Sequence, residues 1–116
     1  MKTKVLAILE GINVPLNNNN VMIDAHEIEE TFNLDEELVI KEFNVDDSLK
    51  KVGGEIAKMA AEGGLTKVAL FIVVADLNLS ELEQFSNRIV EQDLYVIFGA
   101  YEPNEGEANR VVAIMQ

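Results

Sequence analysis

The chain of 116 residues contains no cysteine, no tryptophan, two prolines and only nine Lys and Arg residues. Without cysteine there is no disulfide, no thiol nucleophile and no thiolate metal site. The nine basic residues face 21 acidic ones, and a formal net charge of −12 argues against a nucleic-acid ligand, because phosphate backbones are bound by clustered Lys and Arg. The longest apolar run, residues 68–75, is too short to span a bilayer. The sequence thus indicates neither nucleic-acid binding nor a direct membrane partner.

Apolar residues are sufficient for a core. They make up 48% of the chain, which excludes intrinsic disorder, and the length predicts one domain over residues 1–116. The first ten residues carry two lysines and a short apolar stretch, but Glu10 interrupts it and no small-residue cleavage site follows. We therefore expect no signal peptide and a cytoplasmic location.

The acidic excess is concentrated between Asp24 and Asp47. This stretch holds ten carboxylates against one lysine, Lys41, and so carries nine of the twelve net negative charges. A solvated surface with helix N-caps accounts for such a run, and a surface that meets a cation or a basic partner is the alternative.

The N-terminal third predicts one short helix behind a loop. Residues 4–10 are apolar throughout and fit a helix or a strand, whereas the asparagines of residues 17–20 follow a proline and predict a loop. Residues 23–32 predict a helix in which Asp24 is the N-cap and Glu27 its capping-box partner.

The remaining chain alternates strands and helices. Two amphipathic helices are expected. The first follows an N-cap at Asp46 or Asp47, and its Gly53–Gly54 pair indicates a close neighbour or a weak helix. The second begins with a capping box at Asn78 or Ser80. Strands are predicted over residues 38–43, 67–74, 94–100 and 109–115. The apolar runs of residues 67–74 and 94–100 predict buried strands, and the first is expected to be central and buried on both faces.

This element order predicts an α/β (α+β sandwich) fold. Strands separated by helices imply parallel crossovers, and the last two strands, joined by a turn, should form an antiparallel hairpin. The expected architecture is a four-stranded mixed sheet, βαβαββ after the N-terminal segment, with helices packed on it.

Little catalytic chemistry is visible in the residues themselves. The sequence has no Gly-rich phosphate loop and no Ser nucleophile elbow, and its single His26 excludes a multi-histidine metal site. His26 is expected to be exposed. Asp24 and Glu27 could both project from a helix N-terminus, although a capping box explains them fully.

Three motifs in the second half resemble the C-terminal domain of the FtsZ/tubulin family of polymerising GTPases. The family's D-L-T-L-x-E is matched by Asp76, Leu77, Leu79 and Glu81, and its I-I-F-G-A by residues 97–100. Its G-D-E-x-R-V-T-V-I-A is matched by Gly106, Glu107, Arg110, Val111 and Ile114. The resemblance covers residues 5–116 and is strongest over residues 66–116.

The resemblance extends upstream through residues 21–28, which are similar to the family's N-x-D-F-A-D-V loop. It implies that Asp24 and Glu27 act in trans, reaching the GTP of the adjacent subunit and positioning the water that attacks its γ-phosphate. GTP and Mg²⁺ would then belong to the neighbouring subunit, and this chain alone would hold no cofactor and no metal. Met22, Ala25 and Glu27 depart from the family's Asn, Phe and second Asp, so the resemblance is to a divergent member.

Two functions follow from this resemblance. The first is the polymer-contact domain of an FtsZ/tubulin-like GTPase in cell division or a cytoskeleton, with self or similar subunits as partners through the acidic loop and the helix after it. Residues 1–20 would comprise an interdomain-helix remnant or an extra strand, together with the Asn-rich loop. The alternative is a stand-alone interaction module that binds or caps FtsZ-like filaments without catalysis. A small-ligand function rests on the shape of the fold alone.

Overall fold

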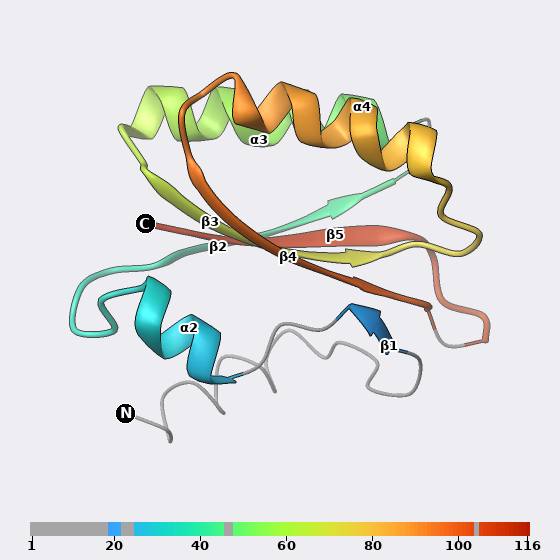
Figure 1. Ribbon diagram of the computed structural model, residues 1–116, viewed down its shortest axis with the longest axis horizontal. Helices are drawn as coiled ribbons and strands as arrows, with labels where there is room; N and C mark the ends of the chain where they lie inside the picture. Colours follow the sequence, from blue (N-terminus) through green and yellow to red (C-terminus); the bar gives the residue numbers. More distant parts are fainter. Residues whose placement is uncertain (1–18, 22–24, 46–47, 104) are drawn as a thin grey trace.

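A five-stranded mixed sheet with helices on both faces forms the described part of the computed structural model, residues 19–21, 25–45, 48–103 and 105–116 (Figure 1). The strands occur in the spatial order β1-β4-β3-β5-β2. The elements are β1 (Asn19–Val21), α2 (Ala25–Thr31), β2 (Val39–Asn44), α3 (Leu49–Gly63), β3 (Lys67–Val73), α4 (Leu79–Val90), β4 (Tyr95–Tyr101) and β5 (Arg110–Met115).

Strand β3 is the centre of the sheet and separates two apolar cores. It pairs in parallel with β4 and antiparallel with β5. Because side chains alternate along a strand, Val68, Leu70 and Ile72 join the core under α3 and α4, whereas Ala69 and Phe71 join the core next to α2. The prediction of a strand buried on both faces is confirmed.

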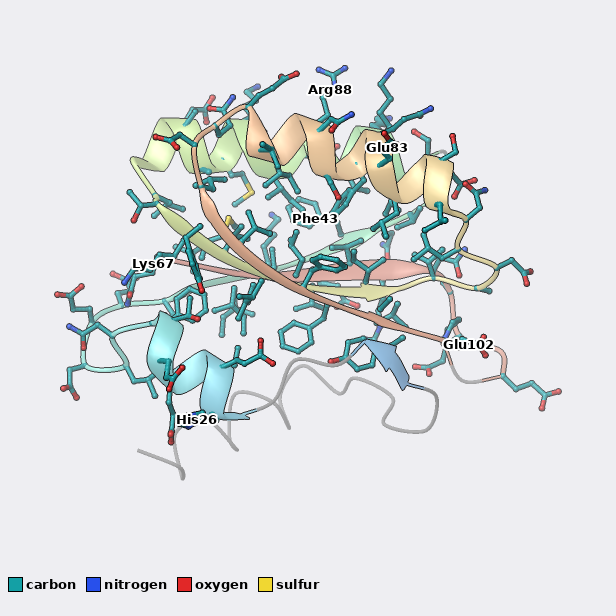
Figure 2. All side chains as sticks on the ribbon, in the orientation of Figure 1. His26, Phe43, Lys67, Glu83, Arg88 and Glu102 are labelled. Carbon is teal, nitrogen blue, oxygen red and sulfur yellow. The ribbon has the colours of Figure 1, made fainter. Side chains whose placement is uncertain are left out.

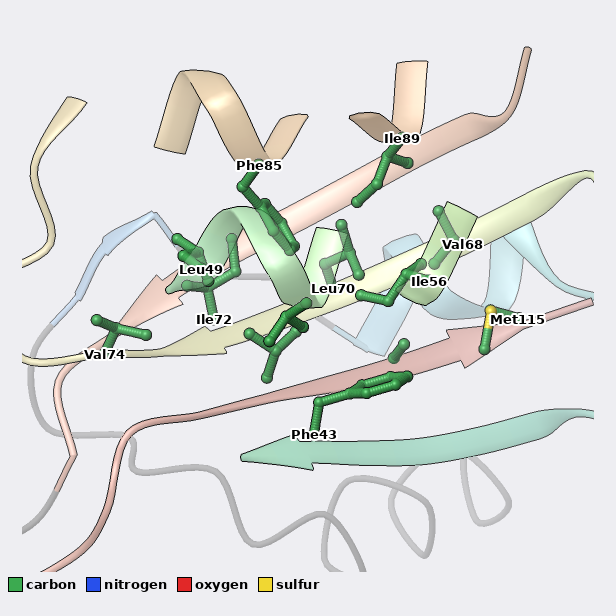
Figure 3. Packing of buried hydrophobic residues seen from close by; sticks show 13 residues of the cluster. Phe43, Leu49, Ile56, Val68, Leu70, Ile72, Val74, Phe85, Ile89 and Met115 are labelled. Carbon is green, nitrogen blue, oxygen red and sulfur yellow. The ribbon is translucent and has the colours of Figure 1, made fainter. Parts of the chain in front are cut away.

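Helices α3 and α4 cover one face of the sheet. From α4, Phe85 and Ile89 reach down to the strands beside Ile56 of α3, as Figure 3 shows. The two helices approach closely at Gly53, where an added Cβ would lie 2.8 Å from the carbonyl oxygen of Phe85. The close neighbour predicted for the glycine pair therefore exists at Gly53, while Gly54 faces open space. The outward side of α4 carries charged residues, including Glu83 and Arg88 (Figure 2).

The helix ends follow local capping chemistry. For α3 the N-cap is Ser48, whose side chain accepts a hydrogen bond from the Lys51 amide, so the predicted cap at Asp46 or Asp47 is wrong. The α4 N-cap is Asn78, as one of the two predicted boxes requires. Gly64 ends α3 with a left-handed backbone (φ 63°), a conformation that glycine adopts without steric cost.

The predicted fold class, with a mixed sheet and packed helices, is confirmed, but the predicted terminal hairpin is wrong. Crossover through α4 places β4 on one edge of β3, and the connection over residues 102–109 carries the chain past β3 to its other edge. There β5 pairs with both β3 and β2, which explains its almost continuous burial. A connection of this length does not force neighbouring strands together as a short hairpin loop does.

Strand β4 is less buried than predicted. Only Gly99 and Tyr101 of this strand are buried, and Tyr95 and Phe98 expose 62% and 41% of their surface. On its outer side, within the described part of the chain, β4 pairs only with the short β1, at Ala100 and Tyr101. The apolar run of residues 94–100 therefore predicts a buried strand where the structure has a partly exposed one.

The N-terminal predictions are tested only in part. The predicted loop of residues 17–20 is wrong for Asn19 and Asn20, because both belong to β1, whose backbone pairs with the end of β4. Helix α2 lies within the predicted residues 23–32. The ambiguous residues 4–10, and Asp24, lie outside the described residues.

Candidate functional site

The predicted catalytic residues flank the start of α2. Asp24 lies outside the described residues, so its predicted cap and its predicted role stay predictions. Glu27 lies in the first turn of α2 and is half-buried. Apolar residues fix the orientation of this helix, because Ile28 and Phe32, one turn apart, are buried in the core beside the sheet.

A recess of about 370 Å³ lies between α2 and the first residues of β3 and β4. Helix α2 and the two paired strand starts, Lys67 and Tyr95, supply its walls. Figure 2 shows Lys67 at the end of the sheet where α2 packs. The recess is lined by Glu27, Glu30, Thr31, Lys67, Tyr95 and Ile97.

The recess combines two carboxylates with one ammonium group. Glu30 also has a partner outside it, since its Oε1 lies 2.8 Å from Nε2 of His26, one turn earlier on α2. Both of these side chains are more than two thirds exposed, so the pair contributes little to stability. The exposure predicted for His26 is confirmed (Figure 2).

Polar contacts of the last residue hold α2 beside the recess. The Gln116 side chain accepts a hydrogen bond from the Asn33 amide (2.8 Å) and donates one to the Asn33 carbonyl (2.7 Å), just beyond α2. The Gln116 backbone carbonyl accepts hydrogen bonds from the amides of Thr66 and Lys67. Gln116 thus links the end of α2 to the start of β3, where Lys67 lines the recess.

Two of the three family-like motifs meet in space. Asp76, Leu77 and Leu79 of the first motif and Phe98 and Ala100 of the second line one hollow of about 300 Å³ at the start of α4. Asp76 has a positive φ of 54°, a conformation that aspartate tolerates better than most residues.

The third motif spans a turn and β5. Gly106 (φ 85°) lies in the turn, and Val111 and Ile114 are fully buried. Arg110 Nη1 donates a hydrogen bond to Glu42 Oε1 (3.3 Å), which joins β5 to β2. Residues of this motif therefore form a turn, fill the core and link β5 to β2.

Sequence reasoning identified Glu27 but missed the residues around it. Lys67 and Tyr95 have a detectable signal, because they are the first residue of one predicted strand and the second residue of another, and the starts of parallel neighbours lie at the same end of a sheet. No local sequence signal identifies Gln116 as the contact of Asn33, since the two are far apart in the chain.

Across the described ranges, no group of three or more His, Asp or Glu side chains lies close enough to hold a metal ion. Among the helices of the described residues, none has the length and apolar character needed to cross a membrane.

No protein-family model and no curated protein sequence matches this chain. Solved structures do share its fold. Thiamine monophosphate kinase from Aquifex aeolicus superposes on 96% of the chain with a TM-score of 0.52 and 11% identity. A mutant FtsZ from M. jannaschii superposes on 94% with a TM-score of 0.52 and 14% identity.

These likenesses concern part of each solved structure. The chain spans 40% of the Aquifex kinase and 36% of the M. jannaschii FtsZ. Identities this low establish similarity of fold alone, and the two solved structures are of differently named proteins. The chain therefore has a fold similar to a part of FtsZ and equally similar to a part of thiamine monophosphate kinase.

Proposed function

We propose that this chain is a polymer-contact domain of an FtsZ/tubulin-like GTPase that presents acidic residues to the GTP site of the adjacent subunit. The observation that carries the proposal is the order of three sequence motifs on a fold similar to that of FtsZ. The first motif opens α4, the second lies in β4, and the third covers the turn before β5 and β5 itself.

The proposed chemistry uses carboxylates at the start of α2. Glu27 is half-buried beside the recess, and Asp24 precedes it by less than one helical turn in sequence. A carboxylate beside a bound γ-phosphate can accept a hydrogen bond from the attacking water and orient it. GTP and Mg²⁺ would be bound by the neighbouring subunit, in a cytoplasmic filament of a cell-division or cytoskeletal system.

The likeness to thiamine monophosphate kinase supports no second proposal. Its TM-score equals that of FtsZ, but the three motifs of this sequence resemble the FtsZ/tubulin family. The filament-capping module without catalysis is the function that remains to be distinguished, because it would use the same surface.

A filament assay distinguishes catalysis in trans from capping. The 116-residue chain is added to filaments of a complete FtsZ-like GTPase, and GTP hydrolysis and pelleted polymer mass are measured together. We expect the chain to bind the exposed nucleotide face, to lower polymer mass and to raise the hydrolysis rate per end. Asp24→Ala and Glu27→Ala should bind equally well but lose at least tenfold of the added hydrolysis.

The matched control is Glu36→Ala, which removes an exposed carboxylate of the same acidic stretch outside α2. It should behave as the unmodified chain does. Lowered polymer mass with no added hydrolysis, unchanged by Asp24→Ala, would support capping alone. If neither hydrolysis nor polymer mass changes, the proposed function is wrong.

A further inference from the structure

Among the described residues, the outer edge of β4 has a strand partner only at its end. Within the described sheet, β1 pairs with β4 only at Ala100 and Tyr101. The preceding residues 95–99 of β4, Tyr-Val-Ile-Phe-Gly, contain no charged side chain. Sheet edges of this kind invite the addition of another strand, and natural proteins usually protect them with charges, prolines or bulges.

Apolar side chains on both sides of this edge are exposed. Phe98 exposes 41% of its surface on the α4 side, next to Val90 of α4 at 65%, and Tyr95 exposes 62% on the α2 side. Between α4 and β4 lies an almost purely apolar hollow of about 150 Å³, whose lining includes Val90, Val96 and Phe98. The edge therefore offers both backbone hydrogen-bonding groups and contacts for apolar side chains.

We propose that a second copy of this chain covers the edge through antiparallel β4–β4 pairing about a two-fold axis at Ile97. Directly opposite residues in an antiparallel pair point to the same face of the sheet. In β4, Tyr95, Ile97 and Gly99 alternate with Val96 and Phe98, which line the hollow on the α4 side.

We call the β4–β4 pairing over residues 95–99 of both copies the seam. The two-fold axis at Ile97 makes every residue pair of the seam apolar. Ile97 lies opposite Ile97 of the second copy, Val96 opposite Phe98, and Tyr95 opposite Gly99, where an aromatic ring can cover the glycine. Strand β1 occupies the edge beyond Gly99 in each copy, so the seam is limited to these five residues, and only a two-fold axis at Ile97 pairs all five of them.

The seam also closes the assembly. The other edge strand, β2, carries Lys41 and Glu42 at its centre, so the sheet of the described residues has one apolar edge, and two-fold pairing uses it in both copies. Because each copy has a net charge of −12, added salt should strengthen the dimer by screening repulsion. A basic peptide on the same edge would instead bind more weakly in salt.

Sedimentation equilibrium of the 116-residue chain tests the dimer. Over the micromolar range the mass should rise from 12.9 kDa towards twice that value. In high salt the same rise should occur at a lower protein concentration. Tyr95→Lys places a charge in the seam at an exposed position and should weaken dimerisation at least tenfold. Ile40→Lys, at a position 48% exposed on β2, is the matched control and should leave the dimer unchanged. A wild-type chain that stays monomeric, or a dimer that Tyr95→Lys does not weaken, overturns the proposal.

The absence of cysteine allows a second test of the register. Opposite residues of antiparallel strands have Cα atoms roughly 4.5–5.5 Å apart, within the range that a disulfide spans. Under mild oxidation Ile97→Cys should form a covalent dimer at least tenfold faster than Tyr95→Cys or Ile40→Cys, with circular dichroism verifying that each variant is folded. Equal rates for Ile97→Cys and Ile40→Cys overturn the proposed seam. Neither experiment involves GTP, so its result is independent of the proposed function.

Discussion

The two edge regions of the sheet are built from opposite chemistry. Strand β2 carries Lys41 and Glu42, and Glu42 accepts a hydrogen bond from Arg110 of the neighbouring β5. Strand β4 carries no charged residue from Tyr95 to Tyr101, and among the described strands β1 pairs only with its end on the outer side. Burial differs in the same sense on the α3/α4 face, where Phe43 of β2 is 7% exposed and Phe98 of β4 is 41% exposed.

This difference indicates which edge of the sheet can accept a further strand and which cannot. Charged side chains on β2 oppose the addition of a further strand, because pairing would desolvate them. An aromatic ring left open on β4 gains by being covered, since burial of apolar surface is favourable. The comparison thus indicates that residues of the β2 edge contribute to the stability of the fold, whereas the β4 edge is the one proposed to associate with a second copy.

Truncation of the two phenylalanines should have the largest effect and the clearest contrast. Phe43→Ala removes a ring from the core under α3 and α4 and should lower the free energy of unfolding by about 3–5 kcal/mol. Phe98→Ala removes a partly exposed ring and should cost about 1 kcal/mol. Urea unfolding followed by circular dichroism, at a concentration where the chain is monomeric, measures both. Equal losses would show that Phe98 is as tightly packed as Phe43 and would remove the contrast between the edges.

The glycine pair of α3 gives the next largest effect and tests what holds α4 over β4. An added Cβ at Gly53 meets the Phe85 carbonyl oxygen at 2.8 Å and its ring at 3.0 Å, so Gly53→Ala should push α4 away and cost about 1–3 kcal/mol. Gly54→Ala meets nothing within 4 Å and should gain up to about 1 kcal/mol from helix propensity. Thermal unfolding of the two variants gives opposite shifts if α4 is fixed at Gly53. A stabilised Gly53→Ala would mean that α4 moves freely over the β4 edge.

The sequence predicted the elements better than their neighbours. The apolar runs of β3 and β5, the stripe of α3 and the Asn78 cap are local patterns, and they determine strands, helices and the helix start correctly. Strand neighbours depend on which edge of β3 the strand β5 occupies. No local pattern encodes that choice, so the hairpin of β4 with β5 was predicted wrongly.

The candidate site shows the same limit. Glu27 was identifiable from the loop–helix pattern and the family resemblance, but Lys67, Tyr95 and Gln116 reach the same region only through the register of the sheet. Long-range hydrogen bonds such as that between Asn33 and Gln116 leave no repeating pattern in the sequence from which they could be predicted. They can be found only after the topology is known.

The smallest expected effect concerns the charged edge itself. Glu42→Gln removes the negative charge facing Arg110, whose side chain is only 14% exposed, and should cost about 0.5–1 kcal/mol. Lys41→Gln, on the opposite face of β2, should change the free energy of unfolding by less than about 0.5 kcal/mol. Because salt screens exposed charges, the difference between Glu42→Gln and the wild type should shrink at high ionic strength. A loss that salt does not reduce would mean that Glu42 acts through packing, in which case charge would not be what distinguishes the β2 edge from the β4 edge.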